Sequence, residues 1–368
     1  MARRLCDESA YPAPLLAVAG FSGVFPTSPL SPSDWSELLS AAEDHRVLGL
    51  LRSTVDAGRL PVTGDQRTEV RAAHRRVLLR VLSLEQNLVA VTALLADAGV
   101  ETRVLKGSAY AHLDYPDPAL RSFIDLDLLF RPADISRAVS VLSSAGFERT
   151  LAEPRPGFDR RFDKGTTLRG PNFEIDLHRT FVLGPWGLRV QLDELWASAS
   201  SFTIGGHELT ALSTPHRFLH ACYHAALGDW PLRLGSLRDV AELHPADEPA
   251  MLALAHRWGV QAVVAAAVAD SMRLLGIPVA GELREWAAAY VPTRREEHWL
   301  GLHTQENKTF AAQAIATLPE LPSLRDKAAY LRALMLPDER YTAGRHTSAL
   351  SRFRFGVREA LRGRGRTP

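Results

Sequence analysis

The stretch that decides the fold reads Phe123-Ile124-Asp125-Leu126-Asp127-Leu128-Leu129-Phe130, an apolar run with an acid at two alternate positions. Side chains at alternate positions of a β-strand share one face of the strand. Asp125 and Asp127 are therefore predicted to project together. The opposite face is predicted to be buried, and it consists of Ile124, Leu126, Leu128 and Phe130.

A second apolar run, Phe173-Glu174-Ile175-Asp176-Leu177-His178, repeats the pattern further along the chain. Asp176 and His178 share one face of this predicted strand. Three carboxylates on neighbouring strands repel each other unless a cation lies among them. Divalent ions such as Mg²⁺ take oxygen ligands and also bridge phosphates. The pattern therefore predicts phosphoryl chemistry, with Asp125, Asp127 and Asp176 as catalytic and metal-binding residues.

A Gly-Ser pair precedes both runs, in Val104-Leu105-Lys106-Gly107-Ser108. Glycine lets the backbone approach a ligand closely, and a serine at the start of a helix offers its hydroxyl and its N–H group to a phosphate. Taken alone, the pair is more typical of an ordinary strand-to-helix turn. Its position ahead of the three acids favours phosphate binding by Gly107 and Ser108.

The order of these motifs resembles the nucleotidyltransferase superfamily with a DNA-polymerase-β-like palm. The chain is most similar to the bacterial branch known as uncharacterised nucleotidyltransferases. The stretches that carry the resemblance are Leu105-Lys106-Gly107-Ser108, Tyr115-Pro116-Asp117-Pro118 with Arg121, Asp125-Leu126-Asp127-Leu128-Leu129, Glu174-Ile175-Asp176-Leu177-His178, and the downstream helical stretch from Phe218-Leu219-His220-Ala221-Cys222-Tyr223-His224 to Leu237-Arg238-Asp239.

The resemblance implies a reaction. Two Mg²⁺ ions would be held by Asp125, Asp127 and Asp176, and a nucleoside monophosphate, AMP from ATP in the first instance, would pass to a hydroxyl acceptor with release of pyrophosphate. Asp176 is also placed to accept the acceptor's proton. The acceptor stays open between a small molecule, a protein and RNA. The alternative is a nucleotide-binding regulatory module that keeps the fold without turnover.

Further side chains are candidates for nucleotide binding. Lys106 and Arg121 offer positive charge to the phosphates or to the leaving pyrophosphate. Pairing of Arg121 with Asp117 or with an active-site acid is an equal alternative. His178 contacts nucleotide or acceptor, or it hydrogen-bonds to Glu174.

Three histidines, His216, His220 and His224, recur every fourth residue and are predicted to line one stripe of a helix. Zinc binding is one interpretation, because histidines at this spacing can reach one metal ion. A second is a wall of the nucleotide pocket, with His224 facing the palm. The third, ordinary helix packing, is the most economical of the three.

Composition sets the remaining expectations. A chain of 368 residues with 46% hydrophobic and 23% charged residues is ordinary for a globular protein, and its net charge of +1 creates no field that demands nucleic acid. Two cysteines, Cys6 and Cys222, fit a reducing, cytoplasmic setting. The basic, apolar beginning is interrupted by acids and prolines, which argues against a signal peptide. No apolar run approaches the ~20 residues of a membrane span.

These patterns predict an α+β fold in four parts. Residues 1–100 form helices that pack on the palm, including one helix over 34–58 capped by Ser33 and another over 65–98 stopped by Gly99. Residues 101–212 form the palm, a small mixed sheet with flanking helices. Residues 213–306 form a helical bundle, with one helix over 249–274. Residues 307–368 form a helical extension whose last 29 residues carry eight Arg against one Glu; this tail binds RNA or anionic lipid, or it is a solvated terminus.

Overall fold

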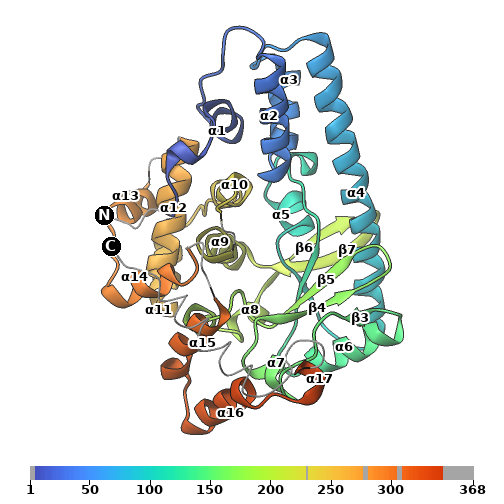
Figure 1. Cartoon of the computed structure of the whole chain (residues 1–368), viewed down its shortest axis with the longest axis vertical. Coiled ribbons are helices and arrows are strands. Elements are labelled where there is room, and N and C mark those ends of the chain that lie inside the picture. The colour runs from blue at the N-terminus through green and yellow to red at the C-terminus, as the bar shows by residue number, and fades with distance from the viewer. Residues whose placement is uncertain (1–4, 229–230, 277–280, 305–308, 343–368) are drawn as a thin grey trace.

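The computed structural model describes residues 5–228, 231–276, 281–304 and 309–342. One mixed seven-stranded sheet forms the centre, in the order β3-β4-β5-β2-β1-β7-β6 (Figure 1). The strands are β1 (Arg103–Val104), β2 (Leu126–Leu129), β3 (Glu148–Arg149), β4 (Gly165–Arg169), β5 (Glu174–His178), β6 (Ala199–Ile204) and β7 (His207–Leu212). The predicted α+β fold is confirmed.

The hairpin of β6 and β7 was not predicted from the sequence. Its two strands are joined by Gly205 and Gly206, whose φ angles are 56° and 83°. A two-residue turn with positive φ at both positions joins antiparallel strands without splaying them, and a Gly-Gly pair is its usual sequence. The hairpin lengthens the sheet beyond β1, where β7 pairs in parallel with β1.

Four helices precede the sheet, namely α1 (Ala13–Ala19), α2 (Pro32–Asp44), α3 (Leu48–Asp56) and α4 (Gly64–Asp97). The single helix predicted over 34–58 is wrong, because the chain breaks at Arg46, which has a left-handed φ of 60°. The cap of α2 is Ser31 rather than Ser33, and its side chain accepts from the N–H of Asp34. The long helix is confirmed as α4, with Gly99 at φ 68° just after its end.

Within the described part of the chain, α4 is the one helix long and apolar enough to cross a membrane, judged by length and composition alone. Buried helices of soluble proteins pass the same test. A third of its most apolar window is buried, and Glu85 within it pairs with His112 of α5 (Ser108–Leu113) at 2.8 Å. The absence of a membrane span stays a prediction.

Further helices lie between the strands and after the last strand. Those between strands are α5, α6 (Ile135–Ser144), α7 (Phe158–Arg161) and α8 (Glu194–Ala197), and those after the sheet are α9 (Thr214–Tyr223), α10 (Leu234–Glu242), α11 (Glu248–Trp258), α12 (Gln261–Leu275), α13 (Glu282–Ala289), α14 (Arg294–Gly301), α15 (Phe310–Thr317), α16 (Leu324–Met335) and α17 (Glu339–Thr342). The helix predicted over 249–274 is two helices, because Gly259 adopts a φ of 65° between α11 and α12. In the view of Figure 1, α9 to α14 lie on one side of the sheet and α4 on the other.

A large apolar core joins most of these layers, with members from Leu5 through the sheet to Ala312. A second, smaller cluster joins α7 to the last described helices through Phe158, Ala314, Leu321, Tyr330 and Ala333. The division into four parts stays a prediction. Of the Arg-rich tail only residues 340–342 are described, and the rest of that prediction lies outside the described residues.

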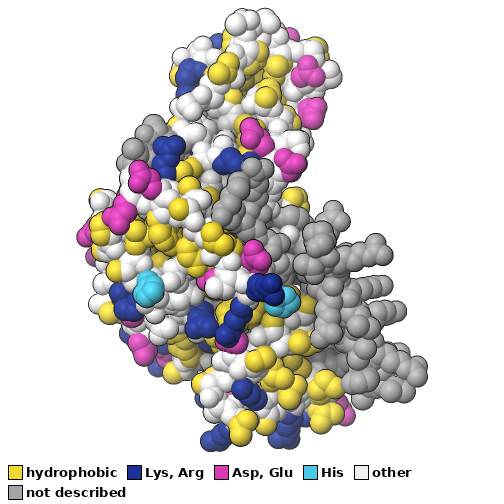
Figure 2. Space-filling view, turned by 90° about the vertical axis from the view of Figure 1, so that its left-hand side faces the viewer, with side chains coloured by type: hydrophobic (Ala, Val, Ile, Leu, Met, Phe, Trp, Pro, Cys, Tyr) yellow, Lys and Arg dark blue, Asp and Glu magenta, His cyan; other side chains and the backbone are white. Residues whose placement is uncertain are grey.

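The surface mixes both signs of charge. On the face drawn in Figure 2, Lys and Arg side chains are interspersed with Asp and Glu, and hydrophobic side chains lie among them. This mixture agrees with the net charge of +1. The protein therefore has no strong overall field that would attract a charged molecule.

Candidate active site

The parallel pairing of β2 with β5 sets two acids side by side. Asp127 of β2 lies directly opposite Asp176 of β5 in the register. The predicted burial of Ile124 is wrong, since its side chain is 67% exposed. Strand β2 begins only at Leu126, so the chain bends at residues 124–125 and the alternation of faces does not extend back to Ile124.

Asp127 is the most buried of the acids, and both of its carboxylate oxygens have a close partner. His178 Nε2 lies 2.8 Å from Oδ1, and the Lys106 ammonium lies 3.1 Å from Oδ2. Because an ionised carboxylate only accepts hydrogen bonds, His178 donates to it from Nε2. A metal ion bound through Nε2 would take the place of this proton. Burial alone opposes ionisation of Asp127, but Lys106 and His178 outweigh it and hold the pKa of the carboxyl well below its usual value.

Lys106 also reaches Asp125, whose Oδ2 lies 3.6 Å from the ammonium. We expected a cation among the acids, and the protein itself supplies one, since the Lys106 ammonium lies between Asp125 and Asp127. Burial favours the neutral amine, but the two carboxylates raise the pKa of Lys106 above its usual value. Asp125 lies at the rim of the site, with 29% of its side chain exposed.

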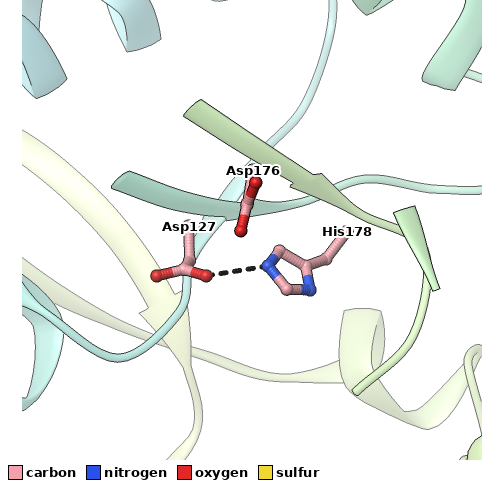
Figure 3. A group of neighbouring side chains, drawn as sticks. All are labelled: Asp127, Asp176 and His178. Atoms are coloured by element: carbon pink, nitrogen blue, oxygen red, sulfur yellow. Dashed lines mark hydrogen bonds and ion pairs between the residues drawn. The ribbon is translucent and has the colours of Figure 1, made fainter. Parts of the chain in front are cut away.

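The side chains that are positioned to hold a metal ion are Asp127, Asp176 and His178. One ligand atom from each lies within 4.8 Å of the others, and Figure 3 shows the three side chains converging from β2 and β5. Thr167 of β4 donates from Oγ1 to Asp176 Oδ1 at 2.5 Å, which orients that carboxylate. Two carboxylates and an imidazole form a donor set suited to a divalent ion. His178 was expected to contact nucleotide or acceptor, or to hydrogen-bond to Glu174, and it was not predicted as a ligand although it shares a strand face with Asp176. Its side-chain partner is Asp127, and Glu174 instead accepts from Arg169.

The depressed pKa of Asp127 makes stability depend on pH. A carboxyl with a folded pKa below its unfolded value near 3.8 contributes its full stability above that value and loses it as the pH falls. In metal-free buffer, urea unfolding from pH 7 down to pH 3 is expected to show the largest difference between wild type and Asp127→Asn at neutral pH. The difference should shrink in acid, and one that grows in acid would contradict the charge assignment.

The turn before α5 follows directly after Lys106, the residue that contacts Asp125 and Asp127. Gly107 has φ 55° and ψ −122°, a conformation that residues with a Cβ rarely adopt. Ser108 is 2% exposed, and its hydroxyl has no hydrogen-bond partner among the residues that the structure describes. A buried hydroxyl without a partner costs free energy unless a ligand satisfies it, which supports the predicted phosphate contact.

Gly107→Ala is expected to destabilise the protein by about 1–3 kcal/mol through backbone strain. The strain is the cause because an added Cβ meets only the Phe123 ring, at an ordinary 3.5 Å. Gly64→Ala is the matched control, since Gly64 has no positive φ and open space around it. Urea unfolding of both variants measures the effect, and equal losses in the two would contradict the assignment of strain to the turn.

Arg121 has a partner that the sequence did not reveal. Its guanidinium binds both carboxylate oxygens of Asp239 on α10, at 2.7 and 2.8 Å, and its Nη1 donates to the carbonyl of Gly107 at 3.1 Å. Tyr115 donates to the same Asp239 at 2.8 Å. Arg121 thus pairs neither with Asp117 nor with an active-site acid in the described part of the chain, and it links α10 to the turn at Gly107.

The three histidines of the predicted stripe have different environments. His216 Nδ1 lies 2.9 Å from the Ser213 hydroxyl, and its ring stacks on Trp258. His220 is buried with Nδ1 2.6 Å from the Tyr110 hydroxyl, and burial first, then His224, His178 and Lys106, lower its pKa well below the usual value. His224 begins the π-helical turn η4 (His224–Gly228).

The zinc interpretation finds no support within the described ranges, where the histidines of α9 belong to no metal-binding group. The surroundings of His220 include His224, His178, Lys106 and Asp127. Sequence spacing marked all three equally, and the Tyr110 contact that distinguishes His220 is 110 residues distant in the chain.

The fold and site combine a mixed seven-stranded sheet with a cluster of two carboxylates and an imidazole on two paired strands. The family described as uncharacterised nucleotidyltransferase matches residues 31–276. The match covers well over half of the chain, so the protein belongs to this family. It also includes α2, α3 and α10, which lie outside the predicted palm.

Other comparisons add little. No curated protein matches the chain. Among solved structures, the chain is similar to an antigenic nucleotidyltransferase-like protein from Paracoccidioides brasiliensis, with 15% identity over 55% of this chain and 94% of that one, and a TM-score of 0.31. A superposition at this level shows nothing about substrate or mechanism.

Proposed function

We propose that the protein is a metal-dependent nucleotidyltransferase that transfers a nucleoside monophosphate, AMP from ATP in the first instance, to a hydroxyl acceptor. The observation that carries the proposal is the register of β2 and β5, which sets Asp127 directly opposite Asp176 beside His178. The family match supports the same class of reaction.

The donor set fits a divalent ion, and we take it to be Mg²⁺, with two ions as the family resemblance implies. Asp125, Asp127 and Asp176 would hold the metal, with His178 close enough to add a fourth ligand. A bound ion would neutralise phosphate charge and lower the pKa of an acceptor hydroxyl.

The chain's own groups account for the rest of the reaction. The acceptor oxygen forms a bond to the α-phosphorus while the bond from that phosphorus to the bridging oxygen breaks, and pyrophosphate leaves. Asp176 takes the proton of the hydroxyl. Gly107 and Ser108 bind phosphate, and Lys106 supplies positive charge to the leaving group. Arg121 holds the Gly107 carbonyl in place, and His224 is proposed to line the nucleotide pocket.

A second candidate function is nucleotide binding without turnover. The observation in its favour is the ion pairing of Lys106 with Asp125 and Asp127, which neutralises the site without any metal. A regulatory module of this kind would bind nucleotide and release it unchanged.

Incubation with each α-labelled nucleoside triphosphate and Mg²⁺, against pools of RNA, lysate protein and small metabolites, separates the two candidates. Transfer of label by wild type and not by Asp127→Asn is the result that the proposal requires. Tight nucleotide binding with no pyrophosphate formed under any condition would favour the regulatory module and contradict the transferase.

The partners and location stay proposals of the same kind. RNA is a possible acceptor through the eight Arg of residues 340–368, and a protein or a small molecule are the other two. Cys6 and Cys222 are both free, which supports a cytoplasmic setting.

A further inference from the structure

Lys106 holds a position that a cation shared by two carboxylates would take. Its ammonium lies 3.1 Å from Asp127 and 3.6 Å from Asp125. The side chain of Asp127 is only 2% exposed, so its negative charge is stabilised by Lys106 and His178 rather than by water. A divalent ion that uses the same oxygen of Asp127 would compete with the ammonium for it.

A lysine at this position is unusual for this protein, in which most basic residues are arginines. The sequence contains 39 arginines and only four lysines, which are Lys106, Lys164, Lys308 and Lys327. Other buried acids pair with arginine, as Asp239 does with Arg121 and Asp114 with Arg217.

The physical difference between the two cations explains the choice. Arginine forms a rigid two-pronged bond to a carboxylate, whereas the lysine ammonium is a point charge on a flexible stem. A flexible cation can leave one anion for another without breaking a fixed geometry. The lysine is found at the one pair of acids that is expected to exchange its cation.

We propose that Lys106 is a resident counter-ion that competes with the divalent ion for Asp125 and Asp127 and gives way when metal and nucleotide enter. This inference rests on the proposed function only in placing a metal at these two acids. The ammonium, once displaced, needs a new anion, and the triphosphate of the substrate provides one. Metal alone therefore binds weakly, and metal binds strongly together with nucleotide.

The test measures binding of Mn²⁺ alone, without nucleotide, from the loss of the free-ion signal in electron paramagnetic resonance. Lys106→Met removes the charge and keeps the length of the side chain, and it is expected to tighten Mn²⁺ binding by about tenfold, since a competing charge in contact with the ligand is gone. Lys106→Arg keeps the charge and should bind Mn²⁺ no more tightly than wild type.

Lys164→Met is the matched control. Lys164 favours the ionised form of Asp127 through its field, but within the described residues it makes no ion pair with that acid. Its removal should tighten Mn²⁺ binding by no more than about twofold to threefold, because a charge outside contact distance is screened. Equal tightening in Lys164→Met and Lys106→Met would overturn the inference in favour of a general field effect.

A measurement on wild-type protein covers the case in which Lys106→Met does not fold. With amines methylated by a ¹³C label, the resonances of the four lysines and of the α-amino group are few enough to assign by substitution. The Lys106 resonance should move on saturation with Mg²⁺ and ATP while that of Lys327 stays in place. A Lys106 resonance unchanged at saturation would overturn the proposal.

The outcomes also separate this inference from the proposed function. If wild type binds Mn²⁺ and Asp127→Asn does not, while Lys106→Met binds no more tightly than wild type, the metal site stands and the counter-ion role is wrong. If no variant binds a divalent ion even with nucleotide present, both proposals fail.

Discussion

Asp127→Asn is expected to reduce nucleotidyl transfer by about a hundredfold to a thousandfold, the usual effect of removing one essential charged group from a site that stabilises developing charge. Asp127 is the acid at the centre of the cluster, paired with His178 and Lys106 and opposite Asp176. An amide keeps the shape of the side chain but loses the charge that a metal ion requires.

The same variant should also unfold more readily. Neutralising Asp127 leaves the Lys106 ammonium with Asp125 alone, and the expected cost is about 1–3 kcal/mol in urea unfolding. Asp125→Asn is the comparison, since Asp125 is more exposed and 3.6 Å from the ammonium, so its stability loss should be smaller. Transfer by Asp127→Asn within tenfold of wild type would remove Asp127 from the catalytic assignment.

Asp239→Asn is expected to destabilise the protein by about 3–5 kcal/mol, because it leaves the buried Arg121 guanidinium without its counter-charge. Both side chains are nearly inaccessible, at 7% and 4% exposed, and Tyr115 shares the same carboxylate. Since Arg121 also holds the Gly107 carbonyl, nucleotide affinity should fall in parallel.

Two further variants make this prediction specific. Replacing both partners, as Arg121→Met with Asp239→Leu, should recover much of the stability because no unpaired charge remains, but it should not recover nucleotide affinity. Glu174→Gln breaks the exposed pair with Arg169 and should cost no more than about 1 kcal/mol. If Asp239→Asn lowers the free energy of unfolding as little as Glu174→Gln does, the pairing of Arg121 with Asp239 does not stabilise the turn at Gly107.

The strands that carry the acids were predictable, because their signal is local. Alternation of apolar and acidic residues in 123–130 and 173–178 follows the two-residue period of a strand. The turn before α5 was likewise predictable from a local stretch, the Gly-Ser pair that ends 104–108. The alternation did not fix where β2 begins. Ile124 was misplaced for that reason.

The contacts that complete the site were not predictable, because they join distant parts of the chain. Asp239 lies 118 residues from Arg121 and His220 lies 110 residues from Tyr110, so no local pattern links either pair. The Lys106 contact is different. From the sequence we expected a cation among the acids and took Lys106 to be a partner of the phosphates. Only the folded structure shows that the Lys106 ammonium itself lies between Asp125 and Asp127.

The most direct test of the central claim uses ATP labelled in parallel at the α and the γ phosphate, with Mg²⁺ and an acceptor pool that supports the reaction. An active site built on Asp125, Asp127 and Asp176 for nucleotidyl transfer predicts that the α label enters the acceptor, that the γ label appears in pyrophosphate, and that both events are lost in Asp127→Asn. Entry of the γ label into the acceptor, or transfer of the α label undiminished in Asp127→Asn, would contradict the assignment.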